Sequence, residues 1–181
     1  MQMASVCVFC GSSPGDDPGF LTLARDLGEM LARREMTLVY GGGRVGLMGA
    51  MADAALAAGG QVIGVIPQLL LDKEVGHRGL TQLHVVRTMA ERKLLMGELS
   101  DAFLTLPGGI GTMDELFEAW TWTQLELHDK PCGLLNYGGY YDALIEFLDH
   151  AVARGFLRPQ FRAELIVDTN LAKLLDRLTS R

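Results

Sequence analysis

The sequence contains no apolar run that approaches the roughly 20 residues needed to span a bilayer. Its first five residues include no basic group of the kind that opens a secretory signal peptide. Together these absences exclude the usual sequence signals of a membrane or exported protein. We therefore expect a soluble, cytoplasmic protein with no membrane partner.

Cysteine is scarce, and its spacing does not suit a metal site. Cys7 and Cys10 form a C-x-x-C pair, and Cys132 stands apart from them. No second C-x-x-C pair follows, and the four histidines show no ligand spacing, so we expect neither a metal nor a cofactor. Because residues three apart in a strand point to opposite faces, Cys7 and Cys10 are expected to be core residues on opposite sides of a sheet.

The chain also lacks an excess of positive charge. Its 181 residues carry a formal net charge of −6, which argues against broad nucleic-acid binding but permits a local cationic pocket. Its apolar share of 49% and charged share of 21% are ordinary for a globular protein. No linker, repeat or low-complexity segment divides the chain, so we expect a single domain over residues 1–181.

Apolar segments of strand length alternate with segments of helical periodicity along the whole chain. The segments expected to be strands are residues 5–10, 37–40, 61–66, 83–86, 102–106, 132–135 and 165–167. Strands separated by helices of roughly 10 to 17 residues indicate right-handed βαβ units and a parallel sheet. The sequence thus predicts an α/β fold: a Rossmann-like domain with about 6–7 parallel strands, helices on both faces, and ligands at the carboxyl ends of the strands.

Three glycine-rich turns follow expected strands, and parallel strands bring such turns to one edge of the sheet. They are Gly11-Ser12-Ser13, Gly41-Gly42-Gly43 and the turn that begins at Gly108. A turn that leads into a helix directs unpaired N–H groups and the positive end of the helix dipole at an anion. The simpler alternative is a well-capped connection between a strand and a helix. Several such turns at one edge favour a small phosphorylated ligand.

The second turn, with Gly46, matches the G-x-G-x-x-G pattern of dinucleotide-binding proteins. Two features argue against NAD. The match follows the second strand rather than the first, and the next strand ends at Ile66-Pro67 with no acidic residue to bind a ribose. A phosphate or nucleotide site at this turn remains open.

The helix expected to begin at Thr112 is apolar on nearly all sides. Its apolar residues are Met113, Leu116, Phe117, Ala119, Trp120, Trp122, Leu125 and Leu127. A sheet can cover only one side of such a helix, which predicts that a second subunit covers another. Glu115 lies one turn beyond the glycines, next to the expected phosphate, whereas Glu126 fits a solvated acidic surface.

Positive charge near the glycine turns is available from the adjacent pair Arg92 and Lys93. Neighbouring residues on a helix point in different directions, so at most one of the two is expected to reach fully into the site. The alternative for either residue is an ordinary solvated position on a helix surface.

These segments together resemble the LONELY GUY family, the cytokinin-activating phosphoribohydrolases that are often mislabelled lysine decarboxylases. The similarity covers residues 9–13, 40–43, 46–49, 89–93, 107–115 and 121–131, and the P-G-G-x-G-T-x-x-E motif with the upstream Arg-Lys pair is its most specific part. Asp114 stands where many relatives have Glu, a change from which we expect little consequence.

The resemblance implies a homodimer, or a higher homo-oligomer, that hydrolyses the N-glycosidic bond of a nucleoside 5′-monophosphate. The products would be the free base and ribose 5-phosphate, and the site would lie near the subunit interface. Arg92 and Glu115 match the catalytic pair of the family. The positions that match or are expected to bind substrate are Glu74, Lys93, Gly108, Gly109, Ile110, Gly111, Thr112, Met113, Asp114 and Thr121, together with Ser12, Gly42 and Gly43.

Two other functions compete with this one. Lysine decarboxylation would need pyridoxal phosphate bound to a lysine. The sequence has four lysines, and none stands in a recognisable cofactor-binding motif: Lys73, Lys93, Lys130 and Lys173. A non-catalytic carrier or sensor of a nucleotide or of molybdenum cofactor would use the same fold. The presence of both Arg92 and Glu115 favours the enzyme. Whether AMP or an N6-modified nucleotide is the substrate stays open at this point.

Overall fold

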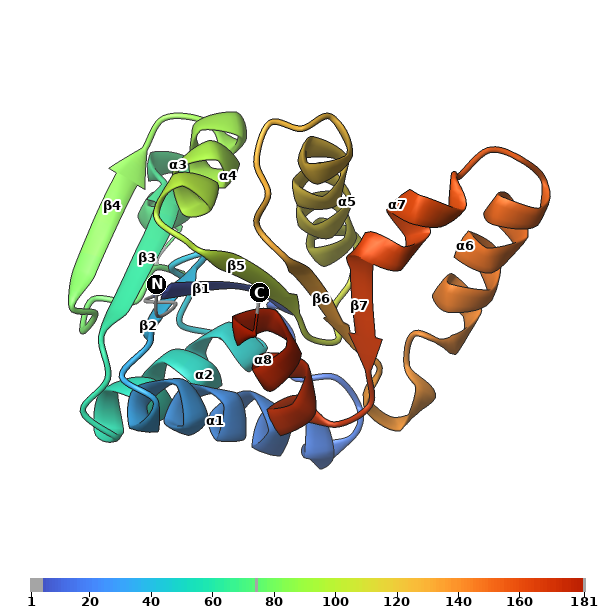
Figure 1. Cartoon of the computed structure of the whole chain (residues 1–181). Helices are drawn as coiled ribbons and strands as arrows, with labels where there is room; N and C mark the ends of the chain where they lie inside the picture. The colour runs from blue at the N-terminus through green and yellow to red at the C-terminus, as the bar shows by residue number, and fades with distance from the viewer. Residues whose placement is uncertain (1–4, 74, 181) are drawn as a thin grey trace.

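A computed structural model describes residues 5–73 and 75–180. It contains one sheet of seven parallel strands between two layers of helices (Figure 1). The strands are β1 (Ser5–Phe9), β2 (Thr37–Tyr40), β3 (Val62–Pro67), β4 (Gln82–Val86), β5 (Ala102–Thr105), β6 (Cys132–Leu135) and β7 (Leu165–Asp168). Their order in the sheet is β4-β3-β2-β1-β5-β6-β7, which confirms the predicted parallel α/β fold.

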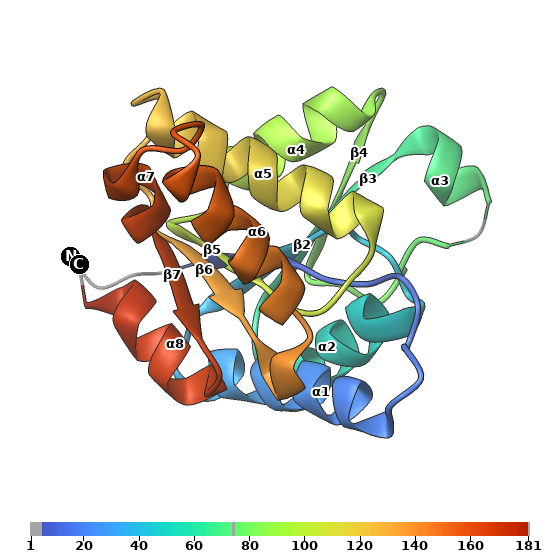
Figure 2. The same ribbon diagram turned by 90° about the vertical axis from the view of Figure 1, so that its right-hand side faces the viewer.

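Helices cover both faces of the sheet (Figures 1 and 2). The helices are α1 (Pro18–Arg33), α2 (Gly46–Ala57), α3 (Gln68–Asp72), α4 (Met89–Glu98), α5 (Ile110–Gln124), α6 (Asp142–Ala153), α7 (Pro159–Glu164) and α8 (Leu171–Thr179), with a 3-10 turn η1 at Tyr137–Gly139. Helices α1, α2 and α8 lie on one face, and α4 to α7 lie on the other. In the described part of the chain, no helix has both the length and the apolar composition needed to cross a membrane.

Alternation along the strands divides the core between the two faces. In β1, Val6 and Val8 pack toward α1, α2 and α8, whereas Cys7 and Phe9 pack toward α4 and α5. Cys10 lies on the same side as Val8, so Cys7 and Cys10 are buried on opposite faces, as predicted. Burial strongly raises the pKa of both thiols, which suits a structural role.

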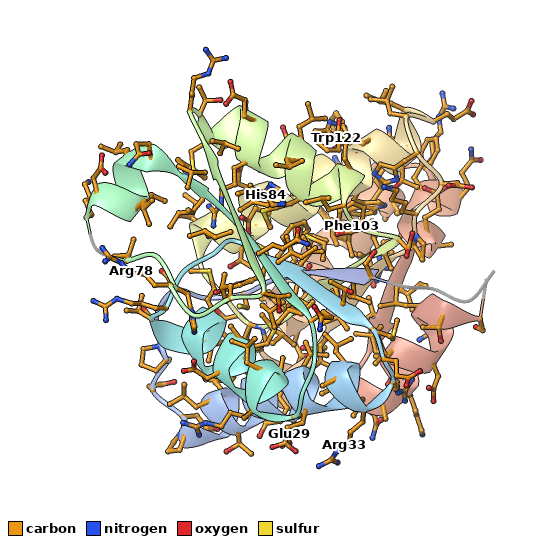
Figure 3. All side chains as sticks on the ribbon, turned by 90° about the vertical axis from the view of Figure 1, so that its left-hand side faces the viewer. Glu29, Arg33, Arg78, His84, Phe103 and Trp122 are labelled. Atoms are coloured by element: carbon orange, nitrogen blue, oxygen red, sulfur yellow. The ribbon has the colours of Figure 1, made fainter. Side chains whose placement is uncertain are left out.

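Local sequence explains where several helices begin. The side chain of Asp17 caps α1 by accepting a hydrogen bond from the Gly19 N–H at 2.8 Å, and Pro18 occupies the first helical position. Thr88 caps α4 in the same way through the Glu91 N–H at 3.1 Å. The outer surface of α1 carries an exposed Glu29–Arg33 ion pair of 2.8 Å (Figure 3).

Two short helices depart from the prediction. Helices α3 and α7 are much shorter than the roughly 10 to 17 residues expected for the helices between strands. Both have six residues or fewer, too short for an apolar period to show in the sequence. Helix α5 also begins at Ile110 rather than Thr112, because Gly109 occupies its N-cap.

The central position of β1 decides where a ligand can bind. The chain leaves β1 toward α1 on one face and leaves the adjacent β5 toward α5 on the other face. The two connections diverge and open a crevice beyond the carboxyl ends of the two strands, which is the usual ligand position in such sheets. Two of the predicted glycine turns flank this crevice directly, after Phe9 and after Thr105.

Candidate active site

A cavity of about 680 Å³ lies at this carboxyl edge, within the size range of small-molecule sites. All three glycine-rich turns contribute to its wall, as does the first turn of α5. Leu70 of α3 and Val75 of the segment between α3 and β4 line a further side. The prediction that the three turns meet at one edge is therefore confirmed.

Backbone hydrogen bonds join the three turns to one another. The Gly11 N–H donates to the Pro107 carbonyl at 3.1 Å, and the Leu47 N–H donates to the Gly11 carbonyl at 3.1 Å. Gly46 has a φ of +61° and packs against the Ser12 backbone so closely that a Cβ would overlap it. Gly108 likewise packs on Thr112 and Gly11, with no room for a side chain. The turn after β1 thus connects the other two.

The N-terminus of α5 presents its first N–H groups at the cavity. Gly109 is the N-cap and offers no side chain to bond them, so they are open to a ligand. A Cβ on Gly109 or on Gly111 would meet nothing within 4 Å, which shows that both glycines border open space. A 15-residue helix with free N–H groups and its positive dipole end directed at a cavity is suited to bind a phosphate.

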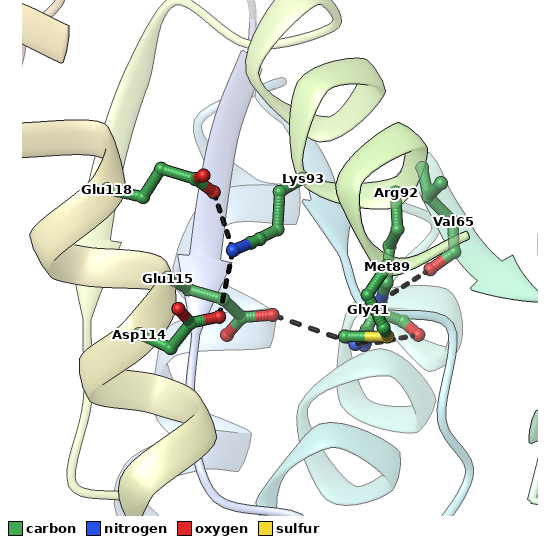
Figure 4. A network of polar contacts seen from close by, with 8 residues as sticks. All are labelled: Gly41, Val65, Met89, Arg92, Lys93, Asp114, Glu115 and Glu118. Atoms are coloured by element: carbon green, nitrogen blue, oxygen red, sulfur yellow. Dashed lines mark hydrogen bonds and ion pairs between the residues drawn. The ribbon is translucent and has the colours of Figure 1, made fainter.

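Arg92 is a buried residue of α4 whose guanidinium is fixed by backbone carbonyls (Figure 4). Its Nε donates to the Val65 carbonyl at 3.1 Å, and its Nη2 donates to the Gly41 carbonyl at 2.9 Å. Both carbonyls lie at the carboxyl ends of β2 and β3. These bonds set the direction of the side chain, and Nη1 lies 3.8 Å from Glu115 Oε1. Of the cavity-lining residues that the structure describes, Arg92 is the one cation.

Glu115 lies in the second turn of α5 and is the one carboxylate among the described residues that line the cavity. Its side chain is nearly as buried as that of Arg92. Burial raises the pKa of this carboxyl to about 7, although the Arg92 charge acts in the opposite direction. A carboxyl with such a pKa can gain or lose a proton close to neutral pH, which is the property required of a general acid or base.

Lys93 points away from the cavity, as expected for one member of an adjacent pair (Figure 4). Its Nζ lies 2.9 Å from Asp114 and 2.8 Å from Glu118, both on α5. Burial alone would lower the pKa of Lys93, but its bonds to Glu118 and Asp114 outweigh burial and raise it. Lys93 therefore joins α4 to α5 on the outer side of the Arg92–Glu115 pair.

The structure brings most of the predicted site residues together. Those that line the cavity are Ser12, Gly43, Arg92, Gly108, Gly109, Ile110, Gly111, Thr112 and Glu115. The described residues Gly42, Lys93, Met113, Asp114 and Thr121 do not line it. Gly42 instead shapes its turn, with a φ of +74° that favours glycine. Thr121 is exposed on the second half of α5, and Glu74 lies outside the described residues.

Sequence reasoning missed the apolar part of the cavity. Met48, Ile66, Leu70 and Val75 line this part; Leu70 belongs to α3, and Val75 to the segment between α3 and β4. Residues 75–77 of this segment are joined to the second glycine turn by two backbone bonds of 2.8 Å, from the Arg44 N–H to the Val75 carbonyl and from the His77 N–H to the Gly42 carbonyl. The clustered Leu69–Leu71 in an otherwise charged stretch was the available signal.

The same chain covers more of α5 than the sequence suggested. Trp120 donates from Nε1 to the Phe161 carbonyl of α7 at 3.1 Å, and Trp122 packs on Gly97 of α4. Figure 1 shows α5 between these two helices. The same chain therefore covers the flanks of α5, and the expectation that a second subunit covers another side stays a prediction. Ile110, Leu125 and Leu127 near the two ends of α5 remain exposed.

The described residues form neither a metal site nor a lysine site in the cavity. Within residues 5–73 and 75–180, no three His, Cys, Asp or Glu side chains are placed to hold a metal ion. None of the four lysines lines the cavity, and Lys93 and Lys130 are bonded elsewhere, to Asp114 and to the Gly97 carbonyl. The cavity that these residues form thus offers no lysine for a pyridoxal phosphate Schiff base.

Comparison with known proteins assigns the family. Residues 48–178 match the family model described as "possible lysine decarboxylase". A cytokinin riboside 5′-monophosphate phosphoribohydrolase of Rhodococcoides fascians is 52% identical over 164 residues, which cover 90% of this chain and 83% of that protein. A cytokinin riboside 5′-monophosphate phosphoribohydrolase of Arabidopsis thaliana, LOG5, is 46% identical over 173 residues, covering 96% of this chain and 76% of that protein.

Solved structures of lower identity share the fold. The molybdenum cofactor carrier protein of Chlamydomonas reinhardtii superposes with a TM-score of 0.74 at 20% identity, over 98% of this chain and 99% of that chain. The molybdenum cofactor binding protein of Rippkaea orientalis gives a TM-score of 0.75 at 20% identity, over 99% and 98% of the two chains. This likeness shows the Rossmann-like fold alone.

The chain belongs to the family of the cytokinin riboside 5′-monophosphate phosphoribohydrolases, the LONELY GUY family. The resemblance drawn from the glycine turns and the Arg-Lys pair is thereby confirmed.

Proposed function

We propose that this chain hydrolyses the N-glycosidic bond of nucleoside 5′-monophosphates, with N6-modified adenosine 5′-monophosphates such as cytokinin ribotides as the preferred substrates. The observation that carries the proposal is the position of Arg92 and Glu115, 3.8 Å apart in the wall of the cavity that the α5 N-terminus opens onto. A fold shared with carriers does not require such a pair.

The division of the cavity supports a defined orientation of the substrate. The α5 N-terminus and the turns at Ser12 and Gly108 suit the 5′-phosphate, because they offer N–H and hydroxyl groups and no acidic side chain. Met48, Leu70 and Val75 suit the base and an apolar N6 substituent. Glu115 lies in the second turn of α5, a position that suits contact with the ribose in this orientation.

The reaction follows from the two charged groups. As the bond between ribose C1′ and the base nitrogen breaks, its electron pair leaves with the base and positive charge builds on the ribose ring. Ionised Glu115 stabilises that charge and accepts a proton from the water whose oxygen bonds to C1′. Arg92 stays protonated and stabilises negative charge on the departing base or on the phosphate. The departing base takes up one proton from solvent and Glu115 releases the one it accepted, so the net products are the free base and ribose 5-phosphate.

We also infer that the chain works as a homodimer or a higher homo-oligomer. Exposed apolar side chains occur on α4 and α6 and at the end of α5, among them Leu94, Phe147 and Leu125. Lys93 belongs to α4 and Thr121 to α5. A second subunit that packs on these two helices would lie next to both residues, which are predicted substrate positions.

The experiment is a product assay with the purified protein. AMP and N6-isopentenyl-AMP are incubated separately, and free base and ribose 5-phosphate are quantified. Glu115→Gln and Arg92→Lys are expected to lower kcat by at least about 100-fold, a common effect of removing one general acid-base or charge-stabilising group. Glu126→Gln and Arg87→Lys are the matched controls, because both residues are exposed and lie outside the cavity. Tight nucleotide binding without base release would favour a carrier and overturn the proposal.

A further inference from the structure

Two consecutive tyrosines after β6 reach across to the glycine turn that precedes α5. Tyr140 Oη donates to the Gly108 carbonyl at 2.8 Å, and Tyr141 Oη donates to the Leu106 carbonyl at 2.7 Å. Tyr140 lines the cavity and is 46% exposed, whereas Tyr141 is buried beneath it. Neither residue belongs to the motifs that identify the family in the sequence.

The Gly108 carbonyl belongs to a peptide group whose other half is the Gly109 N–H. In a planar trans peptide these two groups point in opposite directions, so a bond that fixes the carbonyl also fixes the N–H. This peptide group lies between two glycines, the residues with the widest range of backbone conformations, and it is therefore especially free to rotate. Rotation by half a turn would present a carbonyl oxygen in place of the N–H.

Such a rotation would matter to an anion. Gly109 is the N-cap of α5 and borders open space in the cavity. An N–H directed at a phosphate attracts it, whereas a carbonyl oxygen in the same place would repel it. A hydroxyl bonded to the Gly108 carbonyl from the other side stabilises the attractive orientation.

The tyrosine is itself firmly placed. The rings of Tyr140 and Tyr141 meet edge to face with centroids 4.8 Å apart, and Phe20 contacts Tyr140 with centroids 5.7 Å apart. The Tyr141 N–H donates to Asn136 Oδ1 at 2.7 Å, which fixes the backbone just after Tyr140. The hydroxyl of Tyr140 is thus held by a rigid aromatic group rather than by a mobile loop side chain.

We propose that Tyr140 is a positioning residue for the phosphoribosyl end of the substrate, acting by fixing the peptide group between Gly108 and Gly109 with its N–H toward the ligand. This inference rests on the proposed function for the identity of the substrate. The proposed role of Tyr140 affects the affinity for the phosphate-bearing part of the ligand and not the breaking of the glycosidic bond.

The test is Tyr140→Phe, which removes one oxygen and keeps the ring. We expect KM for AMP to rise about fivefold, the usual effect of losing one hydrogen bond, while kcat stays within about twofold. The Kd of ribose 5-phosphate, measured by titration calorimetry, should rise by the same factor, and the Kd of free adenine should not change.

Two further variants separate positioning from general loosening of the turn. Tyr141→Phe removes the bond to Leu106, whose carbonyl shares its peptide group with Pro107 and so controls no N–H. It should lower the melting temperature with less than twofold effect on ribose 5-phosphate binding. Tyr137→Phe alters the same aromatic cluster outside the cavity and should change neither quantity.

The outcomes also distinguish this inference from the proposed function. If wild-type protein releases base but Tyr140→Phe binds ribose 5-phosphate as tightly as Tyr137→Phe does, the positioning role is wrong and the enzymatic function stands. Equal losses of affinity in Tyr140→Phe and Tyr141→Phe would likewise overturn it. If wild-type protein releases no base yet Tyr140→Phe alone weakens ribose 5-phosphate binding, the positioning role stands and the enzymatic function fails.

Discussion

Arg92 Nη1 and Glu115 Oε1 lie 3.8 Å apart, farther than a direct hydrogen bond, and Arg92 does not depend on Glu115 for its orientation. The carbonyls of Val65 and Gly41 already fix the guanidinium. The arrangement therefore leaves the carboxyl available to exchange a proton or contact a ligand while the positive charge stays in place.

We expect Glu115 to destabilise the ligand-free enzyme at alkaline pH. Its pKa is raised from 4.5 to about 7, so the folded state holds the proton more tightly than the unfolded state does. The resulting stabilisation is complete below about pH 4.5 and is lost as the pH rises through about 7. It contributes at most about 3 kcal/mol to the free energy of unfolding. Glu115→Gln, which is always neutral, should therefore melt at a higher temperature than wild type at pH 8.5 and at a similar temperature at pH 4.5. A difference in melting temperature that does not change with pH, or one that Glu126→Gln reproduces, would contradict this.

The activity should follow the ionisation of the same carboxyl. If ionised Glu115 is the active form, kcat/KM rises with pH up to about 7 and then levels off. The second ionisation of the substrate phosphate, near pH 6, also raises kcat/KM with pH if the dianion binds better. A variant that shifts the pKa of Glu115 alone separates the two ionisations. The Arg92 charge lowers the pKa of Glu115, and Arg92→Met should therefore shift the residual activity profile to higher pH. Arg87→Met, at an exposed position, is the control, and equal profiles for both variants would rule out this assignment.

The glycines of the turn before α5 should respond differently to alanine. Gly108→Ala would overlap Thr112 and Gly11, and it should lower the melting temperature by several degrees. Gly111→Ala meets nothing within 4 Å and lies inside the helix, where alanine is favoured by about 0.5–1 kcal/mol. It should keep or raise the melting temperature yet weaken ribose 5-phosphate binding, because its Cβ occupies the space beside the phosphate. Unimpaired binding in folded Gly111→Ala would place the phosphate elsewhere.

The apolar part of the cavity should set the preference for the base. Leu70→Ser and Val75→Ser each replace an apolar cavity residue with a polar one. Each should lower kcat/KM for N6-isopentenyl-AMP relative to AMP by about tenfold, the order expected for losing one apolar contact. Leu69→Ser is the matched control, because Leu69 is a neighbour in sequence that is 65% exposed. A ratio of the two substrates that stays constant in all three variants would show that the base binds elsewhere.

Short-range sequence patterns were sufficient to predict most of the fold. The strands at Thr37–Tyr40 and Cys132–Leu135 were predicted with the bounds that the structure gives, because buried strands leave strong local signals. Glycine turns after parallel strands also predicted the location of the cavity, since strand direction alone determines that edge.

What the sequence did not predict depends on contacts between distant segments. Tyr140 reaches Gly108 across 32 positions, and Val75 reaches the cavity through bonds to the second glycine turn. The pKa of Glu115 depends on burial by several elements at once. Neither spacing nor periodicity reports such contacts, and the family resemblance supplied Arg92 and Glu115 rather than their geometry.

The turn after β1, which is bonded to both other glycine turns, has a consequence for how this enzyme can diversify. Because Gly11, Gly46 and Gly108 pack on or bond to neighbouring turns, we expect the half of the cavity proposed for the phosphate to tolerate little variation. Leu70 and Val75 line the opposite half, and residues 75–77 are joined to only one of the turns, the one at Gly42 and Arg44. We therefore expect substitutions at Leu70 and Val75 to alter the preference for the base at a smaller cost to folding than substitutions in the three turns.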